Sequence, residues 1–299
     1  MSVSVIIPNY NNAIYLERCL NSVVDDPVVS EVIVYDNAST DKSTDVVVKI
    51  NHPKIRLIEG PLNIGASRAR HAAIQEARQP FLALLDSDDY LAERTLCQCY
   101  NQAMLDDLDI CCATTVIVSL DEQNFIPMTS ALSIMPGKEA VFKTLGRWQF
   151  DPGAGVIRKS VYLQASQCFD FYGYSDDELL SRRIVAAARR VGSGGGTYYY
   201  RLGQRTPTAE QIAMRLLTLV RSLALAVGLD QPGTEPVLRA SRNHLVRGLI
   251  AAHRAWPYDP TQSILQKVGT ETNSLKVPWF LRDLPFRVAL KAIRVRTAG

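Results

Sequence analysis

The sequence lacks the features that would mark an exported, membrane-spanning or thiolate-rich protein. Its 6 cysteines include no C-x-x-C pair, so cysteine gives no indication of function, and we expect these residues to be reduced members of the core. No apolar run approaches the roughly 20 residues that cross a bilayer. Strand-like sequence follows Met1 almost at once, so we expect no signal peptide and a cytoplasmic protein.

Charge, histidine and phosphate-loop patterns are equally sparse. A net charge of +3 is too small to indicate nucleic-acid binding, and the 4 histidines show no metal-ligand spacing. No P-loop is present, because Gly137-Lys138 is followed by Glu139 and lacks the upstream glycine. The 47% hydrophobic fraction of the 299 residues is enough for a sizeable core, in one large domain or a domain with an appendage.

Short apolar strands alternate with amphipathic helices in the first third of the chain. We predict strands at Val3–Pro8, Glu31–Tyr35, Ile55–Ile58 and Phe81–Leu85. This alternation is typical of βαβ units, so the expected fold is α/β, with a mostly parallel sheet flanked by helices on both faces. In such sheets ligands bind at the carboxyl ends of the strands.

Polar residues follow three of these strands at that edge, in the segments Asn9–Asn12, Asp36–Asp41 and Asp86–Asp89. The last segment carries three carboxylates within four residues at the end of a buried strand. Like charges this close repel one another, and a divalent cation with oxygen ligands would remove the conflict. A solvated acidic turn is the alternative. On these residues alone, both interpretations stay open.

The rest of the chain is divided less clearly. Asp109–Ser119 and Phe125–Met128 read as a hairpin, and residues 137–191 as helices interrupted by a short apolar segment. We expect the glycine-rich Val191–Gly196 to be a flexible link; it is not a dinucleotide-binding loop, because it follows a helix and precedes a strand. A boundary near residue 205 divides a domain of residues 1–205 from a helical region of residues 206–299.

Taken in order, these segments resemble a family 2 glycosyltransferase of the GT-A (Rossmann-like) fold. The segments that carry the resemblance are Val5–Asn11, Asp36–Asp41, Asn63–Gly65 with Ala66–Arg70, Asp86–Asp89, Gly155–Ser160, and Phe169-Asp170 leading to Asp176 and Arg182. The resemblance implies inverting transfer of a sugar from a nucleotide diphosphate, usually UDP, to a hydroxyl. The implied acceptor is a glycan or lipid-linked glycan of surface polysaccharide synthesis.

The resemblance also implies roles for individual residues. The donor-binding set it implies is Pro8, Tyr10, Asp36, Arg68, Asp86 and Ser87. Asp88, in the DXD motif that Asp89 extends, would hold Mn²⁺ or Mg²⁺ and so neutralise the charge that builds on the departing diphosphate.

The general base has two candidates. The family pattern places an acidic residue before a Glu-Leu pair and an Arg. Aligning Glu178-Leu179 and Arg182 with this pattern makes Asp176 the base, which we prefer, whereas a shift of one residue makes Asp177 the base. Without any catalytic role, these acidic residues suit the first turn of a helix.

One departure from the family concerns the metal. Many relatives carry a His shortly after a Tyr-Arg pair like Tyr200-Arg201, but here Leu202-Gly203-Gln204 follows. The third metal ligand is therefore undefined, and the alternative function is a catalytically impaired GT-A-like module that binds a nucleotide sugar.

The C-terminal segment Asp283–Arg296 combines an apolar stripe with Arg287, Lys291 and Arg294 at helical spacing. Such a helix either lies in a membrane interface, giving peripheral contact with the inner membrane face, or packs on the catalytic domain. No nucleic-acid partner is expected.

Overall fold

The computed structural model describes residues 3–119, 122–127, 133–144, 152–167 and 176–201. Residues 141–144 and 176–182 belong to a second compact unit, and the other described residues belong to the first. The predicted helical region of residues 206–299, with its basic terminal helix, lies outside the described residues. The division at residue 205 therefore stays a prediction.

The first unit is built on one mixed sheet with the strand order β3-β2-β1-β4-β9-β6-β10-β5. Four neighbouring strands are parallel, as predicted: β1 (Val3–Asn9), β2 (Val29–Asp36), β3 (Ile55–Glu59) and β4 (Phe81–Leu84). The remaining strands of the path are β9 (Gly155–Arg158), β6 (Ile110–Val118), β10 (Arg190–Arg201) and β5 (Tyr90–Leu91). Two short strands pair antiparallel beside them, β7 (Phe125–Pro127) on β6 and β8 (Met135–Pro136) on β10. The predicted hairpin is thus confirmed as β6–β7.

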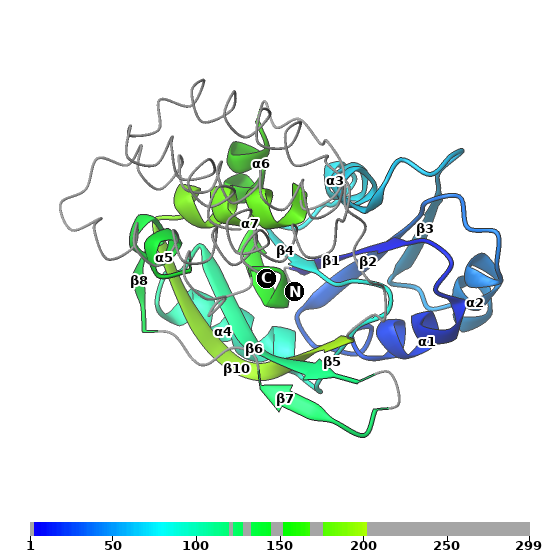
Figure 1. Cartoon of the computed structure of the whole chain (residues 1–299), viewed down its shortest axis with the longest axis horizontal. Coiled ribbons are helices and arrows are strands. Elements are labelled where there is room, and N and C mark those ends of the chain that lie inside the picture. Colours follow the sequence, from blue (N-terminus) through cyan, green and yellow to red (C-terminus); the bar gives the residue numbers. More distant parts are fainter. Residues whose placement is uncertain (1–2, 120–121, 128–132, 145–151, 168–175, 202–299) are drawn as a thin grey trace, which may run out of the picture. The chain divides into compact units, whose positions relative to one another are not determined.

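Helices cover both faces of the parallel strands, which confirms the predicted α/β class. Helices α1 and α2 lie on one side of β1 and β2, and α3 lies on the other (Figure 1). The helices are α1 (Ala13–Asn21), α2 (Ser43–Ile50), α3 (Ala66–Gln75), α4 (Thr95–Leu105), α5 (Gly137–Thr144), α6 (Lys159–Ser166) and α7 (Asp176–Ala187), with a 3₁₀ turn at Pro152–Ala154. Within the described ranges, none of these helices has the length and apolar character needed to span a bilayer.

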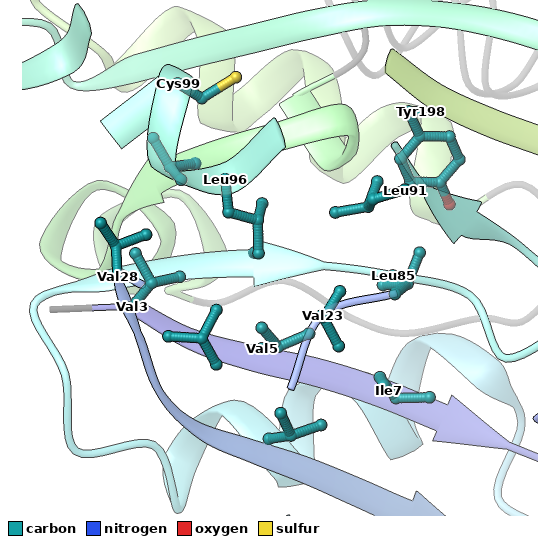
Figure 2. Close-up of a cluster of buried hydrophobic side chains, with 14 of the residues drawn as sticks. Val3, Val5, Ile7, Val23, Val28, Leu85, Leu91, Leu96, Cys99 and Tyr198 are labelled. Atoms are coloured by element: carbon teal, nitrogen blue, oxygen red, sulfur yellow. The ribbon is translucent and has the colours of Figure 1, made fainter. Parts of the chain in front are cut away.

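Strand β1 shows how the sequence directs this packing. Val3, Val5 and Ile7 alternate along the strand and join one apolar cluster with residues of α1, α4 and β10 (Figure 2). Ser4 and Ile6 point to the opposite face, and both are fully buried. A strand buried on both sides reads as a continuous apolar run, which is why the sequence located it so accurately.

The glycine-rich segment Val191–Gly196 is not a flexible link, and that prediction is wrong. It forms the first half of β10, paired with β6 through a register shift between Ser193 and Thr197. A Cβ on Gly194 would lie 2.9 Å from the Cα of Cys99, and a Cβ on Gly196, whose φ is 87°, would lie 2.7 Å from the Cα of Thr95. The glycines therefore allow α4 to pack directly on the strand and form a bulge there.

Asp109, just before β6, joins three strands. It is 1% exposed, and its carboxylate accepts hydrogen bonds from Nε of Arg158 (3.1 Å) and from the backbone N–H (2.8 Å) and guanidinium of Arg189. Burial alone would raise the pKa of Asp109, but the hydrogen bonds from Arg189 and Arg158 outweigh it and hold that pKa below its ordinary value.

We expect Asp109→Asn to lower the free energy of unfolding by about 1.5–3 kcal/mol at pH 7, because charge-assisted hydrogen bonds are lost. The carboxylate's contribution is complete above the unfolded pKa of about 3.9 and disappears as the pH falls through the lower folded pKa. Urea unfolding of both proteins across this range should show the difference shrinking on acidification. A difference that stays constant with pH would contradict the assignment.

Candidate functional site

The carboxyl ends of β1, β2 and β4 form one connected polar edge. The side-chain amide of Asn9 donates to Oδ1 of Asp36 at 2.8 Å, which joins the ends of β1 and β2. The amide of Asn12 donates to the hydroxyl of Ser87 at 2.8 Å, which joins β1 to the acidic segment after β4. The three segments that the sequence placed at one edge therefore meet through direct side-chain contacts.

The turn after β2 is held by its own side chains. Asp36 is 3% exposed and accepts from the backbone N–H (2.8 Å) and hydroxyl (2.6 Å) of Ser39. The Oδ1 atom of Asn11 in turn accepts from the backbone N–H of Thr40 at 2.7 Å. Asp41 accepts from the backbone N–H groups of Ala13 and Ser43, so one carboxylate serves the first turns of both α1 and α2. This edge is a preorganised polar surface.

One atom of this edge is left without a partner. Asn9 is 1% exposed, and among the described residues its Oδ1 accepts no hydrogen bond. A buried acceptor without a donor costs about 1–3 kcal/mol, and a ligand that supplies an N–H group would recover that cost.

Some of the predicted donor-binding residues lie at the polar edge, and one, Arg68, lies on the surface of α3. Pro8 is buried in β1, Tyr10 is 45% exposed immediately beyond it, and Ser87 is buried against Asn12. Arg68 lies on the exposed surface of α3. It is Arg70, two residues later, that forms the ion pair with Asp86. The sequence pattern gave no role to this arginine.

The carboxylates of the acidic segment have different surroundings. Asp86 pairs with Arg70, and its side chain is 43% exposed. Asp89 is buried; its two oxygens accept from the hydroxyl of Tyr198 and the backbone N–H of Arg201, both at 2.7 Å. Burial, followed by the charges of Asp86 and Asp88, raises the pKa of Asp89 to about 8. Asp89 therefore has a structural position, anchoring the segment to β10.

Arg201, at the end of β10, holds the acidic segment from a second direction. It is 4% exposed, and its Nε donates to the backbone carbonyl of Asp88 at 2.9 Å. Its guanidinium pairs with Glu122 at 2.8 Å and lies over the ring of Tyr15, 4.5 Å from the centroid. Glu122 also pairs with Arg18 of α1.

We expect Arg201→Lys to lower the free energy of unfolding by about 1.5–3 kcal/mol, because an ammonium cannot make the same planar set of contacts. The matched control is Arg18→Lys, which keeps the same partner but at a side chain 49% exposed, and should cost less than about 1 kcal/mol. Chemical denaturation of both variants measures the difference. Equal losses would mean that Arg201 has no special structural role.

The carboxylates of the acidic segment suit a metal ion only in part. Among the described residues, no group of three or more His, Cys, Asp or Glu side chains is arranged to hold a cation. Asp86 and Asp89 are already engaged by Arg70 and by β10, so a ligand role falls to Asp88, which is partly exposed. One carboxylate, with water and substrate phosphates completing the shell, is a common way to bind Mg²⁺.

The candidate base lies at the start of α7. This helix begins at Asp176, so Asp176 and Asp177 occupy its first turn, where acidic residues are favourable. Arg182 belongs to the same helix and is 3% exposed. All three residues lie in the second compact unit, and their catalytic roles stay predictions.

A family model described as Glycosyl transferase family 2 matches residues 4–164. The chain is 36% identical over 116 residues to the chondroitin synthase of Pasteurella multocida, a match of 38% of this chain and 12% of that protein. It is also 36% identical over 102 residues to TarS of Staphylococcus aureus, a poly(ribitol-phosphate) beta-N-acetylglucosaminyltransferase, covering 32% of this chain and 18% of TarS. The matched segments thus span less than a fifth of either relative.

Solved structures give the same fold over a longer stretch. The crystal structure of residues 1–349 of S. aureus TarS in complex with UDP-GlcNAc is similar with a TM-score of 0.60 at 18% identity, and the match covers 98% of this chain and 89% of that one. The UDP complex of the same fragment gives 0.59 at 19% identity. At this identity the likeness establishes the GT-A fold.

Proposed function

Because the chain belongs to glycosyl transferase family 2, we propose that it transfers a sugar from a UDP-linked donor to a hydroxyl. The acceptor is a glycan or lipid-linked glycan, the anomeric configuration is inverted, and the product is a surface polysaccharide. The polar edge formed by β1, β2 and β4 is the observation that carries this proposal, because it links three separate segments at the edge where nucleotides bind in α/β sheets.

The unpartnered Oδ1 of Asn9 supports a nucleobase at this edge. Uracil carries an N–H donor between two carbonyl oxygens, so it supplies the hydrogen that this buried atom lacks. Tyr10 adjoins Asn9 and is exposed, so its ring is available to stack on a base. Asp36, directly bonded to Asn9, belongs to the same part of the site.

The other donor contacts follow from the acidic segment. Asp86 serves the ribose and Ser87 fixes the segment against β1 through Asn12. Arg70 sets the orientation of Asp86 through their ion pair. Arg68, exposed on the same helix, is a candidate for the diphosphate.

Asp88 is proposed to hold Mn²⁺ or Mg²⁺, which when bound stabilises negative charge on the diphosphate leaving group. Asp89 and Arg201 keep the backbone of Asp88 in place. Asp176 is proposed to take the proton from the acceptor hydroxyl, with Asp177 as the alternative base. Arg182 is the arginine of the same sequence motif. A carboxylate suffices for this proton transfer if its surroundings tune its pKa.

Domain organisation and location complete the proposal. A catalytic domain of residues 1–205 carries both substrate sites, and residues 206–299 form a helical region. The protein acts in the cytoplasm, and contact with the inner membrane face would come from the basic segment of residues 283–296. That segment lies outside the described residues.

The test is a screen of UDP-glucose, UDP-galactose, UDP-GlcNAc and UDP-glucuronate with Mn²⁺. A ligand at 100 times its dissociation constant adds roughly 2.7 kcal/mol to stability, so the correct donor should raise the melting temperature measurably. The same donor should release UDP slowly by hydrolysis and faster with acceptor. Stabilisation without UDP release would support the impaired binding module instead, and no stabilisation by any donor would contradict both functions.

A further inference from the structure

A pocket of about 480 Å³ is formed by α1, β5, β7 and the end of β10. Its lining includes Arg18 and Asn21 of α1, Tyr90 of β5, Phe125 of β7 and Tyr199 of β10. All of these residues belong to the first unit. None of the residues proposed for donor binding or catalysis lines it. Its volume is within the range of small-molecule sites.

Aromatic rings form one wall of this pocket. Tyr90 and Tyr199 stack with their centroids 4.6 Å apart, and Phe125 meets Tyr199 edge to face at 6.1 Å. Phe125 lies on β7, a three-residue strand paired with β6, and is 51% exposed. An exposed phenylalanine that meets a stacked pair of tyrosines edge to face adds apolar ring surface that a ligand can contact.

Two residues of α1, Arg18 and Asn21, add polar groups to the lining of the pocket. The guanidinium of Arg18 lies over the ring of Tyr90, 3.7 Å from its centroid, and pairs with Glu122 through one nitrogen. A guanidinium has five N–H donors, so several stay available on this half-exposed side chain. Asn21, at the end of α1, adds an exposed amide that can donate and accept.

This combination fits a sugar ring, which has apolar C–H faces and a rim of hydroxyl groups. A nucleic acid would need a basic surface, whereas the charge of Arg18 is balanced here by Glu122. A purely apolar partner would leave the amide and guanidinium unused. We propose that the pocket is a second saccharide-binding site, which holds one unit of a glycan chain while the donor occupies the polar edge.

The choice of a glycan as the ligand rests on the proposed function. The position of the pocket next to the acidic segment supports the same choice. Tyr90 directly follows Asp89 of the acidic segment, and Arg18 shares Glu122 with Arg201, which bonds to the backbone of Asp88. A glycan unit bound at this pocket would therefore contact Arg18 and Tyr90, which adjoin the residues that hold the acidic segment.

The test compares Phe125→Ala with Ile126→Ala in the full chain. Both residues are exposed on β7, but only Phe125 lines the pocket. The proteins are applied to an array of glycosaminoglycan fragments and bacterial surface polysaccharides, and the best-bound glycan is then titrated. We expect Phe125→Ala to bind this glycan roughly tenfold more weakly and Ile126→Ala to match the wild type. Asn21→Ala should weaken binding in the same direction.

Three results would overturn the proposal: no glycan retained by the wild type, equal binding by Phe125→Ala, or equal losses in Phe125→Ala and Ile126→Ala. Calorimetry with UDP and Mn²⁺ on the same proteins separates this outcome from the proposed function. Intact UDP binding with unchanged glycan binding in Phe125→Ala removes only the second site. Absent UDP binding in the wild type removes the proposed function.

Discussion

Asp176→Asn is expected to slow sugar transfer by about 10²–10⁴-fold, the range that a general base contributes, while UDP-sugar binding stays close to wild type. Asparagine keeps the shape of the side chain but cannot accept the proton of the acceptor hydroxyl. The measurement is the initial rate of transfer with the donor identified by screening, combined with calorimetric titration of that donor. Unchanged kinetics would exclude Asp176 as the base.

The control is Asp177→Asn. Both residues lie in the first turn of α7, and only one of them can be the base, so the loss of transfer should be confined largely to one of the two variants. Our preference for Asp176 comes from the alignment of Glu178-Leu179 and Arg182. Loss of transfer in Asp177→Asn with normal transfer in Asp176→Asn would show that the alignment is displaced by one residue.

Asp88→Asn is expected to abolish metal-dependent donor binding. A neutral amide cannot replace the charge of a carboxylate ligand, and the engaged side chains of Asp86 and Asp89 cannot substitute for it. Calorimetry with a UDP-sugar should show that Mn²⁺ strengthens binding to the wild type and has no effect on the variant.

The matched control for this charge change is Asp25→Asn, whose carboxylate is 92% exposed. It should leave the effect of Mn²⁺ unchanged. If Asp88→Asn also kept the wild-type response to Mn²⁺, the assignment of Asp88 as metal ligand would be wrong.

The fold could be predicted from the sequence where the signal was local. The apolar runs that became β1, β2 and β4 are buried on both sides, so composition and length alone identified them. The glycine-rich start of β10 was misread because the reason for its glycines is the close approach of α4, roughly a hundred residues earlier in the chain. Turn propensity gives no information about such a contact.

In the candidate site too, features set by neighbouring residues could be predicted, whereas contacts between residues far apart in the chain could not. The sequence predicts the polar ends of three strands correctly, but it predicts Arg68 at this site, whereas the structure pairs Arg70 with Asp86. Helical spacing offered a signal, since Arg70 precedes the buried Ile74 by one helical turn and so lies nearer the packed face. The anchoring of Asp89 by Tyr198 and Arg201 spans more than a hundred residues, and only the pairing of β10 brings them together.

The central claim is that a uridine diphosphate occupies the edge formed by the ends of β1, β2 and β4. Amide hydrogen exchange of the full chain, with and without UDP and Mn²⁺, tests this location directly. We predict slower exchange in peptides that contain residues 9–13, 36–41 and 86–89, and little change in peptides from β7. Protection by UDP confined to other parts of the chain would contradict the account.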